Sequence, residues 1–136
     1  MTHQILQPPH WPRPRGYSNG VLATGRQVFL GGQIGWDEHG KFGCSDLPGQ
    51  VRQALRNIVT VLAQAGGEPQ HLVRLTWYVT RIEDYRSQVA AIGQAYRDVL
   101  GKVFPPMSVV QVVALVEPEA CVEIEATAVL PDAGVR

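Results

Sequence analysis

The chain has 136 residues, 45% of them hydrophobic, and its twelve lysines and arginines are balanced by twelve aspartates and glutamates. That length is typical of one domain and allows a core without disulfides or a structural metal. With no net charge and a pI near 6.9, the chain lacks the basic surface typical of nucleic-acid-binding domains. An anionic membrane surface is disfavoured as a partner for the same reason.

No apolar run approaches the roughly 18 to 20 residues of a membrane span, and the N-terminus lacks the apolar region of a secretory signal. The chain is therefore expected to be cytoplasmic. Cys44 and Cys121 lie far apart without CxxC spacing, and both are predicted to be reduced. The histidines share no i, i+4 spacing and no phosphate-binding glycine motif occurs, so the sequence predicts neither a metal site nor a cofactor.

Strands and helices are predicted after an N-terminal arm, residues 1–16, which its four prolines are expected to make irregular. Two short strands over 21–23 and 27–33 are joined by only three residues and predict a hairpin. Helical periodicity follows between 46 and 65, with Asp46 as the expected N-cap. Alternation of apolar and polar residues then predicts a strand over 71–80.

A second helix is expected to begin at a capping box formed by Thr80 and Glu83 and to end at Gly101. Two further strands are predicted over 108–115 and 121–129. The resulting order, ββαβαββ, indicates an α+β fold in which two helices pack on one face of a mixed sheet. The domain is expected to span 17–130, and 131–136 form a C-terminal tail.

The last predicted strand, with the sequence CVEIEATAV, carries paired carboxylates. Glu123 and Glu125 alternate with apolar residues, so both are expected on the face opposite Val122 and Ile124. If water covers that face, they are ordinary solvated carboxylates. If another subunit covers it, a partly buried carboxylate has a shifted pKa and can position or activate a water. The sequence leaves both interpretations open.

Six segments, in a fixed order, give the chain a resemblance to the Rid family, also called the YjgF/YER057c/UK114 or endoribonuclease L-PSP family. They are YSNGV (17–21), VFLGGQI (28–34), QALRN (53–57), LTWYVT (75–80), FPPMSVVQV (104–112) and VEIEA (122–126). The resemblance implies a chorismate-mutase-like fold assembled as a homotrimer, with a small-molecule cleft at each subunit interface. It also implies hydrolysis of reactive enamines or imines, which yields a 2-oxo acid and ammonia.

In the family pattern an arginine clamps the substrate carboxylate, backbone groups add hydrogen bonds, a glutamate holds the attacking water and a tyrosine closes the pocket. Carried over by position, this resemblance implies that Glu123 is catalytic. It also implies that Tyr17, Gly32 and Val109 bind substrate.

The arginine position of the pattern holds Met107, and the position of a helical asparagine holds Gly93. A thioether offers apolar surface but no donor, so Met107 cannot form the bidentate pair of a guanidinium with a carboxylate. Losing such a pair costs about 2–5 kcal/mol. We therefore expect a Rid paralogue with Met107 in an altered pocket that accepts an uncharged or aromatic ligand. Arg26 or Arg74 could instead supply a guanidinium from elsewhere.

Three functions remain open at this point. The first is a deaminase-like hydrolase of enamines or imines with altered specificity, and the second is a non-catalytic small-molecule sensor. The third, an endoribonuclease, is disfavoured because the chain lacks a basic run for binding a single strand.

Overall fold

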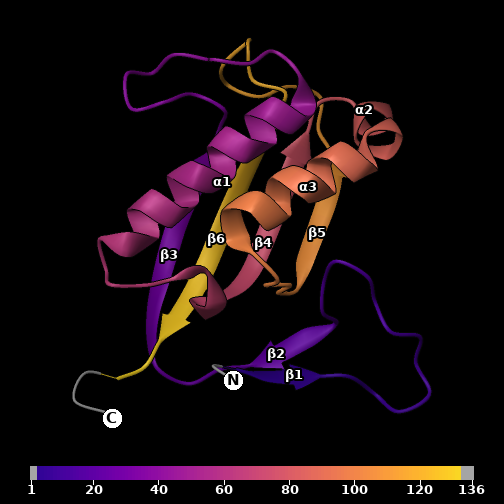
Figure 1. Ribbon diagram of the computed structural model, residues 1–136, viewed down its shortest axis with the longest axis vertical. Coiled ribbons are helices and arrows are strands. Elements are labelled where there is room, and N and C mark those ends of the chain that lie inside the picture. Colours follow the sequence, from indigo (N-terminus) through magenta and orange to yellow (C-terminus); the bar gives the residue numbers. More distant parts are fainter. Residues whose placement is uncertain (1–2, 133–136) are drawn as a thin grey trace.

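A four-stranded mixed sheet forms the centre of the computed structural model, which describes residues 3–132 (Figure 1). Its strands are β3 (Arg26–Gln33), β4 (Leu72–Val79), β5 (Met107–Gln111) and β6 (Val122–Leu130), arranged in the order β3-β6-β4-β5. Strand β6 is antiparallel to both of its neighbours, whereas β4 and β5 are parallel. The predicted α+β class with a mixed sheet is confirmed.

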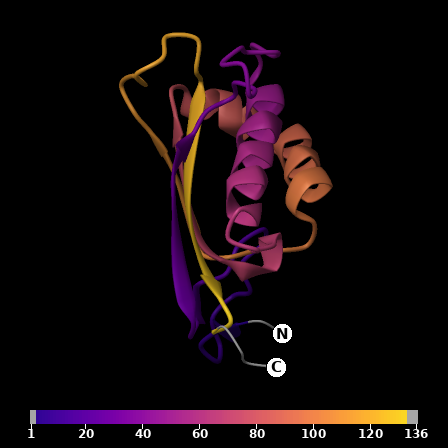
Figure 2. The ribbon, with the colours of Figure 1, turned by 90° about the vertical axis from the view of Figure 1, so that its left-hand side faces the viewer.

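Two amphipathic helices, α1 (Leu47–Ala63) and α3 (Val89–Leu100), cover one face of this sheet and leave the other face open (Figure 2). As predicted, Asp46 caps α1, since its carboxylate accepts from the Gly49 N–H at 3.0 Å. Buried side chains from both helices and from β4 and β6 form one core. Period-3.6 and period-2 patterns therefore point their apolar residues into the same layer. No helix in the described part of the chain is long and apolar enough to cross a membrane.

The predicted hairpin between the first two strands is wrong. Strand β2 (Gly20–Leu22) pairs with β1 (Gln4–Leu6) in a separate two-stranded sheet, and β3 pairs with β6. The arm predicted to be irregular thus contains a strand, because its prolines begin only after Leu6. Gly25 directs the chain toward β6: a Cβ there would lie 1.9 Å from the Leu130 carbonyl oxygen.

The second predicted helix is divided into α2 (Ile82–Ser87) and α3, because Gln88 has φ −122° and ψ 25°. The predicted capping box does not form. Arg81 is the N-cap and contributes no side-chain hydrogen bond. Instead the Ile82 N–H donates to Oε1 of Gln111 at 2.8 Å, so strand β5 satisfies the start of the helix.

The remaining elements differ little from the prediction. A short 3-10 helix, η1 (Pro69–His71), precedes β4, and β5 is shorter than the predicted strand over 108–115. Of the predicted C-terminal tail, 133–136 lie outside the described residues.

Candidate functional site

A cavity of about 610 Å³ opens between α3 and the edge of the sheet formed by β4 and β5. Register pairs Met107 with Leu75 and Val109 with Trp77. Because Leu75 and Trp77 are buried under the helices, alternation turns Met107 and Val109 to that same side. Tyr17 lines the cavity from the N-terminal segment. Three residues implied by the family pattern thus lie in one cavity.

Aromatic rings form one wall of this cavity. Trp77 stacks on Tyr96 with ring centroids 6.2 Å apart, and Tyr96 stacks on Phe104 at 5.7 Å. The ring of Tyr85 meets Trp77 edge-on at 6.2 Å. The Tyr96 hydroxyl donates to the Val103 carbonyl, and burial raises its pKa, so this phenol stays neutral. The wall is therefore apolar and held in place by stacking.

A second group of polar residues lies on the open face of the sheet. Strand β6 places Glu123 opposite Tyr78 and Glu125 opposite Thr76, as the alternation predicts. The Tyr78 hydroxyl donates to Oε1 of Glu125 at 2.6 Å, and this hydrogen bond raises the pKa of Tyr78. Glu123 is half-buried and Glu125 is exposed.

Gly32 on β3 leaves room for the Glu123 carboxylate. A Cβ at position 32 would lie only 2.0 Å from Oε2 of Glu123, so the carboxylate occupies the space that a side chain would fill. Gly31, the neighbouring glycine, has no atom within 4 Å of such a Cβ. The absence of a side chain at Gly32 therefore lets the Glu123 carboxylate lie directly against the backbone of β3.

A single chain does not bring all the predicted site residues together. The structure gathers Tyr17, Met107 and Val109 in the cavity on the helix side. It places Gly32 and Glu123 together on the open face. Residues of a common site would then have to come from two chains.

Neither arginine offered by the sequence as a substitute lies at the cavity. Arg26 donates through Nε to the Pro131 carbonyl at 3.1 Å, at the far end of the sheet. Arg74 lines a small depression on the open face with Phe29 and Glu125. Within this chain, neither replaces the guanidinium that Met107 lacks.

Sequence reasoning missed two other arginines, Arg15 and Arg97, which do line the cavity. Arg97 lies one helical turn after Gly93, and a Cβ at Gly93 would lie 3.3 Å from its Nη1. The sequence signal that could have identified Arg97 is its i, i+4 spacing from Gly93, because on a helix this spacing lets the Arg97 side chain pass over the glycine.

Comparison with known proteins identifies the family and agrees with the fold. A family model described as Endoribonuclease L-PSP matches residues 11–130. The chain belongs to this family. A RutC family protein of Synechocystis is 31% identical over 133 residues, covering 96% of this chain and 99% of that protein. Human 2-iminobutanoate/2-iminopropanoate deaminase is 30% identical over 114 residues, which cover 83% of this chain and 79% of that protein.

Solved structures of the Rid family share the fold. A Rid-family protein of Yersinia pestis is 34% identical with a TM-score of 0.84, and the match covers 96% of this chain and 100% of that chain. RidA of a Psychrobacter species is 27% identical with a TM-score of 0.67, and the match covers 93% of this chain and 99% of that chain. The predicted Rid fold is therefore confirmed.

Proposed function

We propose that this chain binds a small enamine- or imine-type metabolite in a cleft between subunits and hydrolyses it with Glu123. The group bound against Met107 is apolar. The observation that carries the proposal is the position of Met107: it lines an aromatic and aliphatic cavity at the site where the family pattern has an arginine. The reaction class is supported by similarity to 2-iminobutanoate/2-iminopropanoate deaminases.

A homotrimer would bring the two groups of residues into one cleft. Met107 and Glu123 occupy opposite faces of the sheet, so the open face of one subunit must meet the cavity of its neighbour. Apolar side chains on that face support such a contact: Phe29 is 73% exposed and Val110 is 44% exposed. They lie on the two edge strands, β3 and β5, so a subunit that covered the whole open face would remove both from water.

The change at Met107 determines what the cleft favours. A substrate carboxylate at this position would lose a charge-assisted fork, which corresponds to roughly 30-fold to several-thousand-fold in affinity. An apolar group at this position binds more tightly instead, because each methylene buried against Met107 contributes about 0.8 kcal/mol to the free energy of binding. The cavity therefore selects substrates that carry an aliphatic or aromatic group where small imino acids carry only their carboxylate.

Hydrolysis needs one base and one water. Water adds across the C=N bond as its oxygen bonds to carbon, and Glu123 accepts the released proton and transfers it to nitrogen. The hydroxyl proton of the carbinolamine is then transferred to its nitrogen, again through Glu123, and the C–N bond breaks, which releases ammonia and leaves a carbonyl. In this scheme the absence of a side chain at Gly32 leaves room for the carboxylate of Glu123 at this position, and no cofactor takes part.

A coupled assay tests this function. Imines generated from phenylalanine or leucine by an amino-acid oxidase should be hydrolysed faster than 2-iminopropanoate. Glu123→Gln should abolish turnover and leave binding of a non-reacting analogue intact. Rates on 2-iminopropanoate equal to those of an arginine-bearing relative would contradict the altered pocket. Binding without turnover of any imine would favour a non-catalytic sensor.

A further inference from the structure

The lining of the cavity carries an unbalanced charge. Its residues include two arginines, Arg15 and Arg97, and no aspartate or glutamate. The chain as a whole has as many acidic as basic residues, so this local excess is a property of the site. Both arginines are exposed, whereas the deeper wall of the cavity is aromatic and aliphatic. The positive charge therefore lies at the rim of an apolar interior.

Arg97 has donors available for a ligand. Its Nη2 donates to Oε1 of Gln94 at a long 3.3 Å, and in the described chain no carboxylate lies within ion-pair distance of its guanidinium. Arg52, by contrast, is paired with Asp98 at 3.0 Å. A guanidinium has five N–H donors in a rigid fork that fits a carboxylate. Most of the donors of Arg97 are thus unused.

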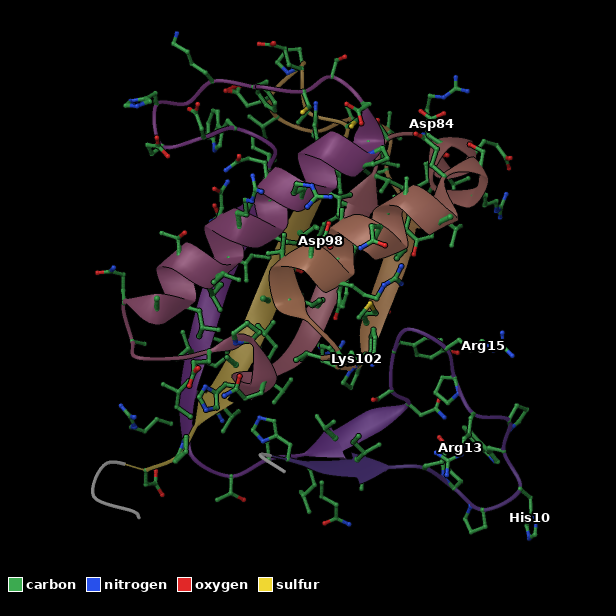
Figure 3. The ribbon with its side chains drawn as sticks, in the orientation of Figure 1. His10, Arg13, Arg15, Asp84, Asp98 and Lys102 are labelled. Atoms are coloured by element: carbon green, nitrogen blue, oxygen red, sulfur yellow. The ribbon has the colours of Figure 1, made fainter. Side chains whose placement is uncertain are left out.

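Gly93 leaves room for that guanidinium beside the helix. The hypothetical Cβ of Gly93 would be 3.3 Å from Nη1 of Arg97, and both residues line the cavity. A larger side chain at position 93 would displace the guanidinium from this wall. In Figure 3 the side chain of Arg15 extends from the N-terminal loop away from the strands. Arg97 is therefore the better placed of the two cations.

We infer that Arg97 is the anion-binding residue of this cavity and that the ligand is an amphipathic carboxylate. Its aromatic or branched aliphatic group lies against Met107 and Val109, and its carboxylate lies at Arg97 on α3. The inference rests on the proposed function and deepens it. The positive charge that the family pattern places on strand β5 is supplied here from the helix, which leaves the floor of the cavity apolar.

The test uses two probes of nearly the same shape, 3-phenylpropanoate and its neutral amide, 3-phenylpropanamide, in calorimetric titrations of the intact protein. The wild-type protein should bind the carboxylate more tightly than the amide. Arg97→Gln should weaken binding of the carboxylate about tenfold, as expected for a charge-assisted hydrogen bond at an exposed site. It should leave the amide unchanged. Arg56→Gln removes the same charge from an exposed position on α1 and should change neither affinity.

A second variant separates this inference from the proposed function. Met107→Gln places a polar group in the floor and should weaken both probes equally, because both bury the same ring. If Met107→Gln changes neither affinity, the proposed function fails. If both probes bind equally tightly, or Arg97→Gln weakens the carboxylate no more than Arg56→Gln does, the inference is overturned. Failure of both probes to bind also overturns it.

Discussion

Met107 and Glu123 project from opposite faces of the same sheet. Met107 is paired with Leu75, whose side chain is buried under the helices, whereas Glu123 is paired with Tyr78 on the open face. No rotation of side chains can bring their functional groups together through a close-packed sheet. A site that uses both residues has to be shared between subunits.

This relationship requires more than one subunit, and the proposed homotrimer predicts three in solution. Light scattering should give three times the 14.9 kDa of one chain. Phe29→Glu should dissociate the assembly, since it buries a charge in the contact. Val61→Glu, on the exposed side of α1, removes another exposed apolar residue and should leave the mass unchanged. A monomeric wild-type protein would contradict the shared site.

The contact between Gly32 and Glu123 predicts unequal effects of two similar substitutions. Gly32→Ala should lower imine hydrolysis at least about tenfold because the carboxylate must move, and such misplacement of a catalytic group is costly. Gly31→Ala meets open space and should keep most activity. Equal activity of the two single variants would argue against this role.

Gln50 predicts a large effect on stability. Only 1% of its surface is exposed, and its amide bonds the carbonyls of Cys44 and Glu119 and the Cys121 N–H. Gln50→Leu leaves these groups unpaired and should reduce the free energy of unfolding by about 2–4 kcal/mol. Urea denaturation measures the loss. Gln64→Leu, at an exposed position, is the matched control and should change the free energy of unfolding little.

The two cysteines should differ in reactivity. Burial raises the pKa of Cys121 from 9.0 to about 11, so at about pH 8 roughly one thiol in a thousand is ionised. Exposed Cys44 should be alkylated first. Because the raised pKa belongs to the folded state, its contribution to stability is complete below about pH 9 and is lost as the pH rises toward 11.

Mass spectrometry after limited alkylation provides the check. In Cys44→Ser the remaining thiol should react only slowly until urea unfolds the protein. Rapid modification of Cys121 in the native protein would show that the thiol is not buried.

Much of the sheet could be predicted because its signals are local. Alternation in the last strand assigns Glu123 and Ile124 to opposite faces wherever that strand pairs. Strand pairing is not local: β3 pairs with β6, almost a hundred residues later in the chain. The close approach of Gly25 to the Leu130 carbonyl accompanies that pairing and is visible only in three dimensions.

The break at Gln88 was equally hidden, because the apolar periodicity continues across it. The Gln111 side chain satisfies the start of α2 from another element, which local capping rules do not consider.

The candidate site was predictable only at positions that belong to the family pattern. Tyr17, Met107 and Val109 belong to matching segments, and the register of β5 turns Met107 and Val109 toward the cavity that Tyr17 also lines. Arg97 belongs to no such segment. Its guanidinium lies beside Gly93, where a larger side chain would stand in its way. Matching of motifs compares the residues at given positions and does not show which neighbouring side chain uses the space beside a glycine.

The most direct test of the account is hydrolysis of 2-iminopropanoate by Met107→Arg. If the wild-type protein hydrolyses this substrate slowly because Met107 replaces the arginine that binds the substrate carboxylate, the variant should gain at least about tenfold in kcat/KM. The restored guanidinium can form a charge-assisted, bidentate pair with the carboxylate. Met107→Leu, which keeps the site apolar, should match the wild-type protein. A wild-type rate already equal to that of arginine-bearing relatives, or no gain in a correctly folded Met107→Arg variant, would contradict the central claim.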